Sequence, residues 1–449
     1  MSDGLNSFLF STPEMTEVFS AGEQLRAMMR FEWMLNRALE AHGLAEAGSS
    51  IVLESLMDAD FVDIESLKSH AKEVGNIAIP FVKQLTSAVQ ELDERAARAI
   101  HLGATSQDLL DTALVLQMKK AINLLEGASE RMEAAIVEQV RRHRDTVLTG
   151  RTWMQAGPPT TLGLKLAGTV AALRRHRKRL HAAADRALRL EFGGAVGTLA
   201  SLGDAGGAVS TELARLLELR EAEIPWHSQR DSVVEVVQVL ANLTGSLAKF
   251  ARDTSLLMQP EVGELSEGSN EGRGGSSTMP QKHNPVGCAA VIAAHQKMPG
   301  LAVTMLHSMP QEHERGLGLW QAEWDTVPEA FRLTAAALNY AIVIAEELEV
   351  DAKRMTTNFN ALLGMNMAEA VSTRLASDIG RSEAHELVRR ATKRARDENR
   401  HLRDVLNEMP EVSTHLTKAD INRLLEPQSY LGGARRFIER VLGETDADH

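Results

Sequence analysis

The amino-acid sequence predicts an all-α protein built around several long helices. Aromatic residues make up only 4% of the 449-residue chain, and strands favour aromatic and β-branched residues. The chain is instead rich in Ala, Leu, Glu, Arg and Met, which favour helices. Proline interrupts helix interiors, and none occurs between Pro80 and Pro158. Between Pro159 and Pro260 the only proline is Pro225, so there is room for long helices.

The first part of the chain, residues 1–107, shows shorter helical patterns with turns at Gly43, Gly48 and Gly75. From Asp108, apolar residues recur every three or four positions over several heptads, which predicts one helix to about residue 144. The same periodicity predicts four further long helices, over residues 161–190, 231–257, 286–309 and 328–348.

Helical patterns shorten again after about residue 351, over residues 351–363, 366–377, 382–398 and 401–407. Among the long helices, we expect Pro299 to interrupt the one that contains it. Several of them carry apolar residues on more than one face, so we expect other subunits to extend the bundle core. The predicted organisation is an N-terminal cap, a central long-helix bundle and a C-terminal cap, over residues 1–107, 108–350 and 351–449.

The composition excludes several classes of protein. Cys288 is the only cysteine, so neither an intramolecular disulfide nor a Cys-based zinc or iron–sulfur site is expected. The formal net charge of −12 argues against a nucleic-acid partner. The N-terminus lacks the pattern of a signal peptide, and no uncharged stretch reaches the ~20 residues of a membrane span. We therefore expect a soluble, cytoplasmic protein without a membrane partner.

Polar and Gly-rich segments interrupt the helical pattern, and such loops often carry binding groups. In the first, residues 101–108, the hydroxyls of Thr105 and Ser106 and the free N–H groups of a helix start suit an anionic ligand. A structural role is the alternative, because Thr105 and Asp108 have the spacing of a helix-capping box.

Two further segments are weaker signals. Residues 150–161 contain Arg151 and Gln155, which are candidates to hold a carboxylate, with a plain interhelix connection as the alternative. Residues 192–200 are rich in glycine but lack the spacing of a dinucleotide-binding loop. We expect a turn or a close approach between helices there.

The fourth segment, residues 272–285, is the most informative. It reads GRGGSSTMPQKHNP and places serine, lysine and asparagine donors close together in a loop that is not a Walker loop. Elsewhere, the polar run over residues 313–315, which ends at Arg315, predicts either the rim of an active site or a solvated helix end. His385 has no second histidine at metal-ligand spacing, so we expect no metal and no other cofactor.

The stretch GSSTMPQKHNP, residues 275–285, resembles the GSSxMPxKxNP signature of the fumarase/aspartase superfamily. Residues 103–108 and 150–161 resemble two further sequence blocks of that superfamily. Its members are all-helical homotetramers with a central 20-helix bundle, and each active site draws on three subunits. The resemblance therefore implies a homotetramer with shared active sites for this chain, and it accounts for the apolar long helices.

Within the superfamily, several stretches resemble the bacterial 3-carboxy-cis,cis-muconate cycloisomerases, namely residues 101–108, 150–153, 192–195, 225–231 and 309–324. Fumarases and the adenylosuccinate and argininosuccinate lyases carry a catalytic His in the second block, where this sequence has Trp153. The resemblance implies cofactor-free closure of 3-carboxy-cis,cis-muconate to 4-carboxymuconolactone, a step of protocatechuate degradation in the β-ketoadipate pathway.

The resemblance also implies roles for individual residues. A tricarboxylate substrate is expected to contact Thr105, Ser106, Arg151, Trp153, Gln155, Asn284 and Arg315. One proton must be delivered to carbon. Ser276 is the favoured donor, with Ser277 and Lys282 as alternatives, and His101 is expected to orient the first block.

Two other functions stay open at this point. A lyase that releases fumarate from a substrate such as adenylosuccinate is disfavoured by Trp153, which replaces the acid–base His. A non-catalytic helical tetramer is disfavoured by Ser276, Lys282 and Asn284, because a scaffold does not need such a loop. For an anionic substrate, Arg and Lys side chains from several subunits would have to reverse the acidic net charge locally.

Overall fold

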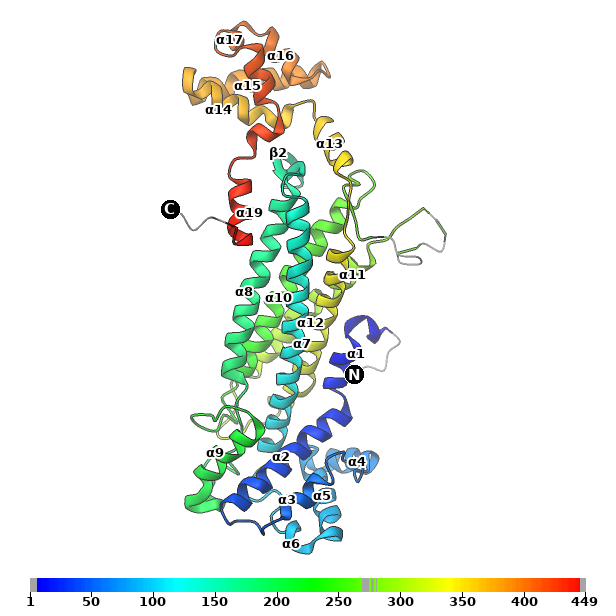
Figure 1. Ribbon diagram of the computed structural model, residues 1–449, viewed down its shortest axis with the longest axis vertical. Coiled ribbons are helices and arrows are strands. Elements are labelled where there is room, and N and C mark those ends of the chain that lie inside the picture. The colour runs from blue at the N-terminus through cyan, green and yellow to red at the C-terminus, as the bar shows by residue number, and fades with distance from the viewer. Residues whose placement is uncertain (1–5, 269–273, 276–277, 280, 445–449) are drawn as a thin grey trace. The chain divides into compact units, whose positions relative to one another are not determined.

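The computed structural model describes residues 6–268, 274–275, 278–279 and 281–444, and nearly all of their regular structure is helical (Figure 1). The all-α prediction is therefore confirmed. The N-terminal part contains short helices, as predicted, apart from the 21-residue α2, and it has left-handed glycines at Gly43, Gly48 and Gly75. Its elements are η1 (Ser7–Phe10), α1 (Pro13–Val18), α2 (Ala21–Ala41), α3 (Ser49–Glu54), α4 (Ile64–Val74), α5 (Ala78–Leu92) and α6 (Glu94–Ala97).

The long helices lie close to their predicted bounds. They are α7 (Ser106–Arg142), α8 (Leu162–Ala187), α10 (Asp231–Leu257), α11 (Val286–His307) and α12 (Glu323–Glu346), with η2 (Ala200–Ala205) and α9 (Gly206–Leu217) between α8 and α10. Two expectations about proline were wrong. The helix α11 continues through Pro299, and α12 begins five residues before Pro328. A helix loses one backbone hydrogen bond at a proline, and these two helices continue despite that loss.

Residues 147–161 form a hairpin, whereas the sequence predicted either a carboxylate-binding segment or a plain interhelix connection over residues 150–161. Here β1 (Val147–Thr152) pairs antiparallel with β2 (Gln155–Thr161), with a β-bulge between Thr149 and Arg151. The prolines of β2 fit because each strand of a two-stranded sheet keeps a free edge. Thr161 ends the hairpin and caps α8, where its Oγ1 accepts the N–H of Leu164 at 3.1 Å. A second short pair joins β3 (Leu265–Ser266) to β4 (Glu349–Val350).

The C-terminal part returns to short helices, as predicted. Its elements are α13 (Ala352–Asn360), η3 (Met365–Met367), α14 (Ala368–Ile379), α15 (Arg381–Asp397), α16 (Leu402–Glu408), α17 (Pro410–Ser413), α18 (Lys418–Leu424), η4 (Pro427–Tyr430) and α19 (Ala434–Leu442). The helices from α13 to α18 share a hydrophobic core that includes Leu375, Leu387, Leu406 and Ile421.

The chain contains two compact units. The first comprises Met1–Ser129, His176–Gly245 and Ala293–Asn339, and the second comprises Glu130–Arg175, Ser246–Ile292 and Tyr340–His449. The division into three domains along the sequence stays a prediction. In the part of the chain that the structure describes, α10 and α12 are long and apolar enough to cross a membrane, but 61% and 72% of their most apolar windows are buried. The core helices of soluble proteins share this property.

Candidate active site

In the first unit, the carboxylate of Asp108 joins two turns of the chain. Asp108 lies in the first turn of α7, and its side chain is fully buried. The Oδ2 atom accepts the N–H of Thr105 at 2.9 Å, which is half of the predicted capping box. The N–H groups of Gly193 and Gly194 donate to Oδ1 and Oδ2 at 3.0 and 2.9 Å. The glycine-rich segment, residues 192–200, thus contains a turn whose backbone N–H groups bind the carboxylate of Asp108.

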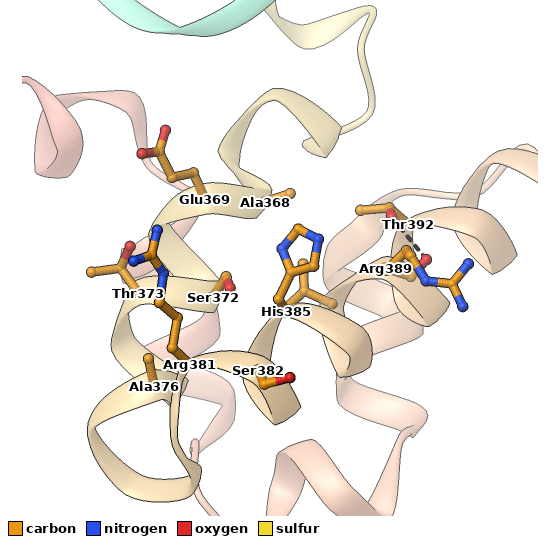
Figure 2. Close-up of a pocket in the computed structure, with 11 residues that line it drawn as sticks. Ala368, Glu369, Ser372, Thr373, Ala376, Arg381, Ser382, His385, Arg389 and Thr392 are labelled. Atoms are coloured by element: carbon orange, nitrogen blue, oxygen red, sulfur yellow. Dashed lines mark hydrogen bonds between the residues drawn. The ribbon is translucent and has the colours of Figure 1, made fainter.

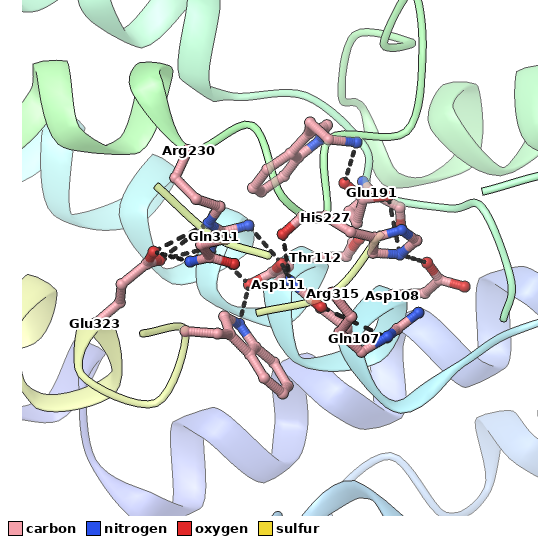
Figure 3. A network of polar contacts seen from close by, with 12 residues as sticks. Gln107, Asp108, Asp111, Thr112, Glu191, His227, Arg230, Gln311, Arg315 and Glu323 are labelled. Atoms are coloured by element: carbon pink, nitrogen blue, oxygen red, sulfur yellow. Dashed lines mark hydrogen bonds and ion pairs between the residues drawn. The ribbon is translucent and has the colours of Figure 1, made fainter. Parts of the chain in front are cut away.

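His227 lies between Asp108 and a second buried carboxyl group, that of Glu191 (Figure 3). Its Nε2 is 2.6 Å from Oδ1 of Asp108 and 3.2 Å from Oε1 of Glu191. Burial, with added repulsion from Asp111 and Asp108, raises the pKa of Glu191 to about 9. Glu191 therefore favours its protonated form at neutral pH.

Asp108, Glu191 and His227 are also residue types that bind metals, and their ligand atoms lie within 4.8 Å of one another. Two ligands of one tetrahedral zinc ion would lie roughly 3.3 Å apart, given zinc–ligand bonds of ~2.0 Å. The 2.6 Å contact between His227 and Asp108 is shorter and is a hydrogen bond. Hydrogen bonding therefore accounts for this cluster.

Beside this cluster, Arg230 forms the centre of a second buried network (Figure 3). Its guanidinium donates to Asp111 at 2.7 and 3.0 Å and to Glu323 at 2.6 and 3.1 Å. It also stacks 4.7 Å from the ring centroid of Trp226. Burial alone would lower the pKa of Arg230, but Asp111 and Glu323 outweigh it and raise that pKa above its usual range. Two further hydrogen bonds complete the network. The indole N–H of Trp320 donates to Asp111, and the side-chain amide of Gln311 donates to Glu323.

Arg315 connects this buried region to the predicted substrate contacts. Its guanidinium donates to the carbonyl of Ala195 at 2.8 Å and lies 3.4 Å from both the carbonyl of Gly194 and Oε1 of Gln107. Gln107 is the neighbour of Ser106 in α7. Three residues predicted to contact the substrate, Thr105, Ser106 and Arg315, are therefore gathered around the same two turns and are half-buried.

His101 is held by a carboxylate from α2. Its Nδ1 lies 2.6 Å from Oε1 of Glu32, and its backbone N–H donates to Oε2 at 3.0 Å. Burial lowers the pKa of His101, but the Glu32 carboxylate outweighs this effect, and the net shift is upward. The predicted role of His101, to orient residues 101–108, is compatible with this attachment and stays a prediction.

In the second unit, Arg151 already has a carboxylate partner within the protein. Its guanidinium makes a bidentate ion pair with the buried Glu264, at 2.7 and 3.0 Å. The amide of Asn358 donates to the same carboxylate at 2.9 Å. The positive charge that the sequence assigned to a substrate carboxylate is thus compensated by Glu264.

Trp153 lies at the tip of the hairpin and is 97% exposed. Trp153 and Met154 both have left-handed backbone angles, with φ of 51° and 63°. Two successive positive φ values define a type I′ turn, which usually contains Asn or Gly because other side chains are strained there. Gln155, which follows, is exposed too. Two of the predicted substrate contacts are therefore displayed on an exposed, strained turn.

The signature loop is described only in part. Ser276 and Ser277, the predicted proton donors, lie outside the described residues. Asn284 folds back onto the loop, since both its backbone and its side-chain N–H groups donate to the carbonyl of Gly274, at 2.8 and 3.1 Å. Lys282, the alternative acid, has an exposed side chain.

A groove of about 1040 Å³ lies between α14 and α15 (Figure 2). Arg381 and His385 of α15 line it together with Ser372 and Thr373 of α14. None of its lining residues is among those predicted to contact the substrate. The groove therefore lends no support to the predicted set.

Sequence reasoning named Asp108 only as a helix cap and did not identify the buried polar network around it, namely Asp111, Glu191, His227, Arg230 and Glu323. A usable signal was present for Asp111, which interrupts the apolar stretch that opens α7. A charged residue within an apolar pattern is costly unless it is paired, so it indicates a partner elsewhere in the chain.

Comparison with known proteins agrees with this architecture. A family model described as "Lyase" matches residues 10–300, and one described as "Adenylosuccinate lyase C-terminus" matches residues 364–441. The 3-carboxy-cis,cis-muconate cycloisomerase of Pseudomonas aeruginosa is 48% identical over 438 residues, which are 98% of this chain and 95% of that protein.

Two solved structures are similar over nearly the full length. One is the 3-carboxy-cis,cis-muconate lactonizing enzyme from Pseudomonas putida, with a TM-score of 0.92, 45% identity and coverage of 98% of this chain and 99% of that chain. The other is the β-carboxy-cis,cis-muconate cycloisomerase from Acinetobacter calcoaceticus, with a TM-score of 0.92, 38% identity and coverage of 98% and 100%. This chain therefore belongs to the lyase family of the fumarase/aspartase superfamily, in the branch formed by the 3-carboxy-cis,cis-muconate cycloisomerases.

Proposed function

We propose that this protein closes 3-carboxy-cis,cis-muconate to 4-carboxymuconolactone, as a step in the degradation of protocatechuate. The observation that carries this proposal is the 48% identity, over nearly the whole chain, to a protein with that named activity. The sequence supports it independently, because Trp153 replaces the histidine on which the fumarate-releasing lyases depend.

The reaction suits a site that binds carboxylates but supplies no nucleophile. One carboxylate of the substrate attacks a carbon–carbon double bond of the same molecule, so both reactants are already tethered. A carbon–oxygen bond forms, negative charge moves onto a neighbouring carboxylate as an enediolate, and a proton is then added to carbon. The trianionic substrate becomes a dianionic lactone, with the uptake of one proton from solution.

The enzyme must therefore hold three carboxylates and stabilise the developing charge. Thr105, Ser106 and Arg315 offer hydroxyl and guanidinium donors on the first unit, and their attachment to the Asp108 region supports this role. Gln155 and Asn284 offer amide donors on the second unit. For Arg151, the ion pair with Glu264 favours a structural role in the hairpin over direct contact with substrate.

For the proton donor, Ser276 is our first candidate, with Ser277 and Lys282 as alternatives. A serine hydroxyl is a weak acid and needs a nearby cation or N–H donors to stabilise its alkoxide. Lys282 lies six residues along the same loop and offers such a cation. If Lys282 is instead the acid, its ammonium group would deliver the proton to carbon.

We also propose a homotetramer whose active sites are shared between subunits, located in the cytoplasm. Exposed apolar side chains support an assembly. Val303 and Leu306 of α11 are 52% and 45% exposed, Leu317 is 88% exposed, and Trp153 is 97% exposed. Large exposed apolar groups of this kind are typical of interaction surfaces.

The activity is tested by incubating the purified protein with 3-carboxymuconate and following the loss of its ultraviolet absorbance. We expect turnover, accompanied by the uptake of one proton per molecule in a weakly buffered solution. If the compound is stable while adenylosuccinate releases fumarate, the protein is a lyase. If neither reacts, it is a non-catalytic protein.

The proton donor and the shared site are tested with variants. Ser276→Ala should lower kcat by about 10²–10⁴-fold, and a folded variant with wild-type kcat would exclude Ser276 from the chemistry. Mixing inactive Ser276→Ala with inactive Arg315→Ala should restore part of the activity if different subunits contribute the two residues to one site. If mixed subunits exchange but no activity returns, the site is not shared in this way.

Trp153 is tested by substitution with histidine. If Trp153 distinguishes the cycloisomerases from the lyases, Trp153→His should lower lactone formation and allow measurable elimination of fumarate from a succinyl substrate. Unchanged lactone formation without any fumarate would show that Trp153 is not the discriminating residue.

A further inference from the structure

We propose that Asp108, held by His227, is a positioning residue that locks two turns together and so places Thr105, Ser106 and Arg315 for the reaction. The link to the reaction rests on the proposed function, whereas the locking of the turns is a property of the fold. Asp108 itself is fully buried and is not proposed to touch the substrate.

The first step of the argument is the set of donors around Asp108. Its two oxygens accept backbone N–H groups from Thr105, Gly193 and Gly194, and they contact Nε2 of His227 at 2.6 Å. The turn before α7 and the turn after Glu191 are 85 residues apart along the chain. Their closely spaced hydrogen bonds to one carboxylate fix each turn relative to the other, because buried donors lack solvent as an alternative partner.

The second step is the close approach of the two turns. A Cβ atom at Gly194 would lie 2.9 Å from the carbonyl oxygen of Gly103, and Gly194 has a φ of +70°. Gly103 also has a positive φ, and a Cβ there would lie 2.6 Å from Leu202. Only glycine fits such a junction without displacement of the backbone. The two turns therefore meet backbone to backbone, with the carboxylate between them.

The third step connects this junction to the predicted substrate contacts. Thr105 and Ser106 belong to the first turn, and Arg315 donates to the carbonyls of Gly194 and Ala195 in the second. A shift of the second turn would therefore move the guanidinium as well. A displacement of catalytic or binding groups by about 1 Å is enough to cost a rate factor of roughly 10².

The fourth step separates Asp108 from Glu191. Both carboxyl groups approach the same Nε2 of His227, but Glu191 accepts one backbone N–H, that of Trp226 at 2.6 Å, and its Oε1 is buried without a hydrogen-bond partner. Glu191 is protonated at neutral pH and makes no bond to either turn through its side chain. The two acids therefore form a matched pair of which only Asp108 accepts hydrogen bonds from both turns.

The experiment compares Asp108→Asn with Glu191→Gln, each nearly isosteric. Asp108→Asn should raise KM about 10-fold or more and lower kcat/KM by roughly 10²-fold, because the binding groups are displaced. Glu191→Gln should stay within about threefold of wild type, because it replaces a neutral group by another of the same shape. Gln117→Leu, which removes the buried hydrogen bond from the Gln117 side chain to the carbonyl of Val18, is the control for general destabilisation and should leave KM unchanged.

His227 provides a second pair of variants. His227→Leu removes the donor to Asp108 and should raise KM, whereas His227→Gln keeps an N–H donor near the position of Nε2 and should restore most of the loss. These two variants also test the proposal if Asp108→Asn does not fold. A purely structural role would lower the amount of folded enzyme in both variants without a change in KM.

A readout independent of turnover is hydrogen exchange, measured by mass spectrometry on peptides that cover residues 101–110 and 190–200. Both peptides should lose protection in Asp108→Asn and keep it in Glu191→Gln. Unchanged exchange and an unchanged KM in Asp108→Asn would overturn the proposal, as would equal losses in both variants. If the wild type does not convert 3-carboxymuconate, the proposed function fails, and the exchange measurement still decides whether Asp108 locks the turns.

Discussion

Two regions that hold the candidate substrate contacts differ in how they are built. In the first unit, the turns near Asp108 rest on buried polar groups, among which Arg230 is only 1% exposed and has two carboxylate partners. In the second unit, Trp153 and Met154 are 97% and 70% exposed and occupy a strained turn at the tip of a hairpin. The first region is organised by buried contacts within one chain, and the second displays its side chains to solvent.

The difference shows how the side chains of each region are held in position. Buried ion pairs restrict their region strongly, because removing either partner leaves a charge without compensation. A strained exposed turn persists when the neighbouring structure holds it, and such strain is common at functional positions. We therefore expect a substitution that breaks the buried ion pairs of Arg230 to lower stability strongly, and a substitution at the exposed hairpin tip to change stability little.

The largest effect is expected for Arg230→Met. This change leaves Asp111 and Glu323 buried without their cation and should lower the free energy of unfolding by about 3–5 kcal/mol. Thermal and denaturant unfolding measure the loss. Arg186→Met, which breaks an exposed pair with Glu235, is the control and should change stability little. If Arg230→Met and Arg186→Met lowered the free energy of unfolding equally, burial would not explain the loss at Arg230.

A smaller loss is expected for Arg151→Met in the second unit. Glu264 is buried, but Asn358 stays as one of its partners and Arg151 is partly exposed, so the cost should be about 2 kcal/mol. Arg151→Lys should recover part of it. A large rise in KM without a loss of stability would instead show that Arg151 binds substrate directly, which would reverse the structural assignment.

Glu191 links stability to pH. Its pKa is about 9 in the folded protein, against 4.5 for an ordinary glutamate, so the folded state holds a proton that the unfolded state releases between these values. The free energy of unfolding should therefore fall as pH rises from about 5 to 9, by at most about 1.4 kcal/mol per pH unit from this group. Glu191→Gln should remove this slope, which unfolding measured at pH 6, 7 and 8 would reveal. If the free energy of unfolding changed with pH equally in the wild type and in Glu191→Gln, this prediction would be wrong.

The smallest effect is expected at the hairpin tip. Met154→Gly relieves a left-handed residue that costs ~1–2 kcal/mol, while glycine adds unfolded-state entropy worth ~0.5–1 kcal/mol. The net result should be a stabilisation of about 0.5 kcal/mol, seen as a small rise in Tm. Ile51→Gly, at an exposed position inside α3, is the control and should destabilise. A loss of stability in Met154→Gly would show that the Met154 side chain supports the turn.

Much of the fold could be predicted from the sequence, because helical periodicity is a local property. The helix over residues 231–257 was predicted with its observed bounds, and the breaks at Gly43, Gly48 and Gly75 were identified correctly. The hairpin at residues 147–161 was missed, because its prolines suggested a loop and its pairing is visible only when the two strands meet.

The candidate site, too, could be predicted from the sequence only in part. The signature loop and the first block could be identified from short runs of residues, and Trp153 was the residue from which the cycloisomerase branch was predicted. The sequence also indicated that Thr105 and Asp108 cap a helix. It carried no sign that Asp108 receives N–H groups from Gly193 and Gly194 as well, since those donors lie 85 and 86 residues away.

By itself, the sequence determined the helical class, the positions of the long helices and the family, because periodicity, proline spacing and a contiguous signature are all local along the chain. Only the tertiary structure decided which charged residues are buried together. Arg230 pairs with Asp111 and Glu323, at separations of 119 and 93 residues. A buried charge requires a partner, and the partner is chosen by which surfaces the fold brings into contact.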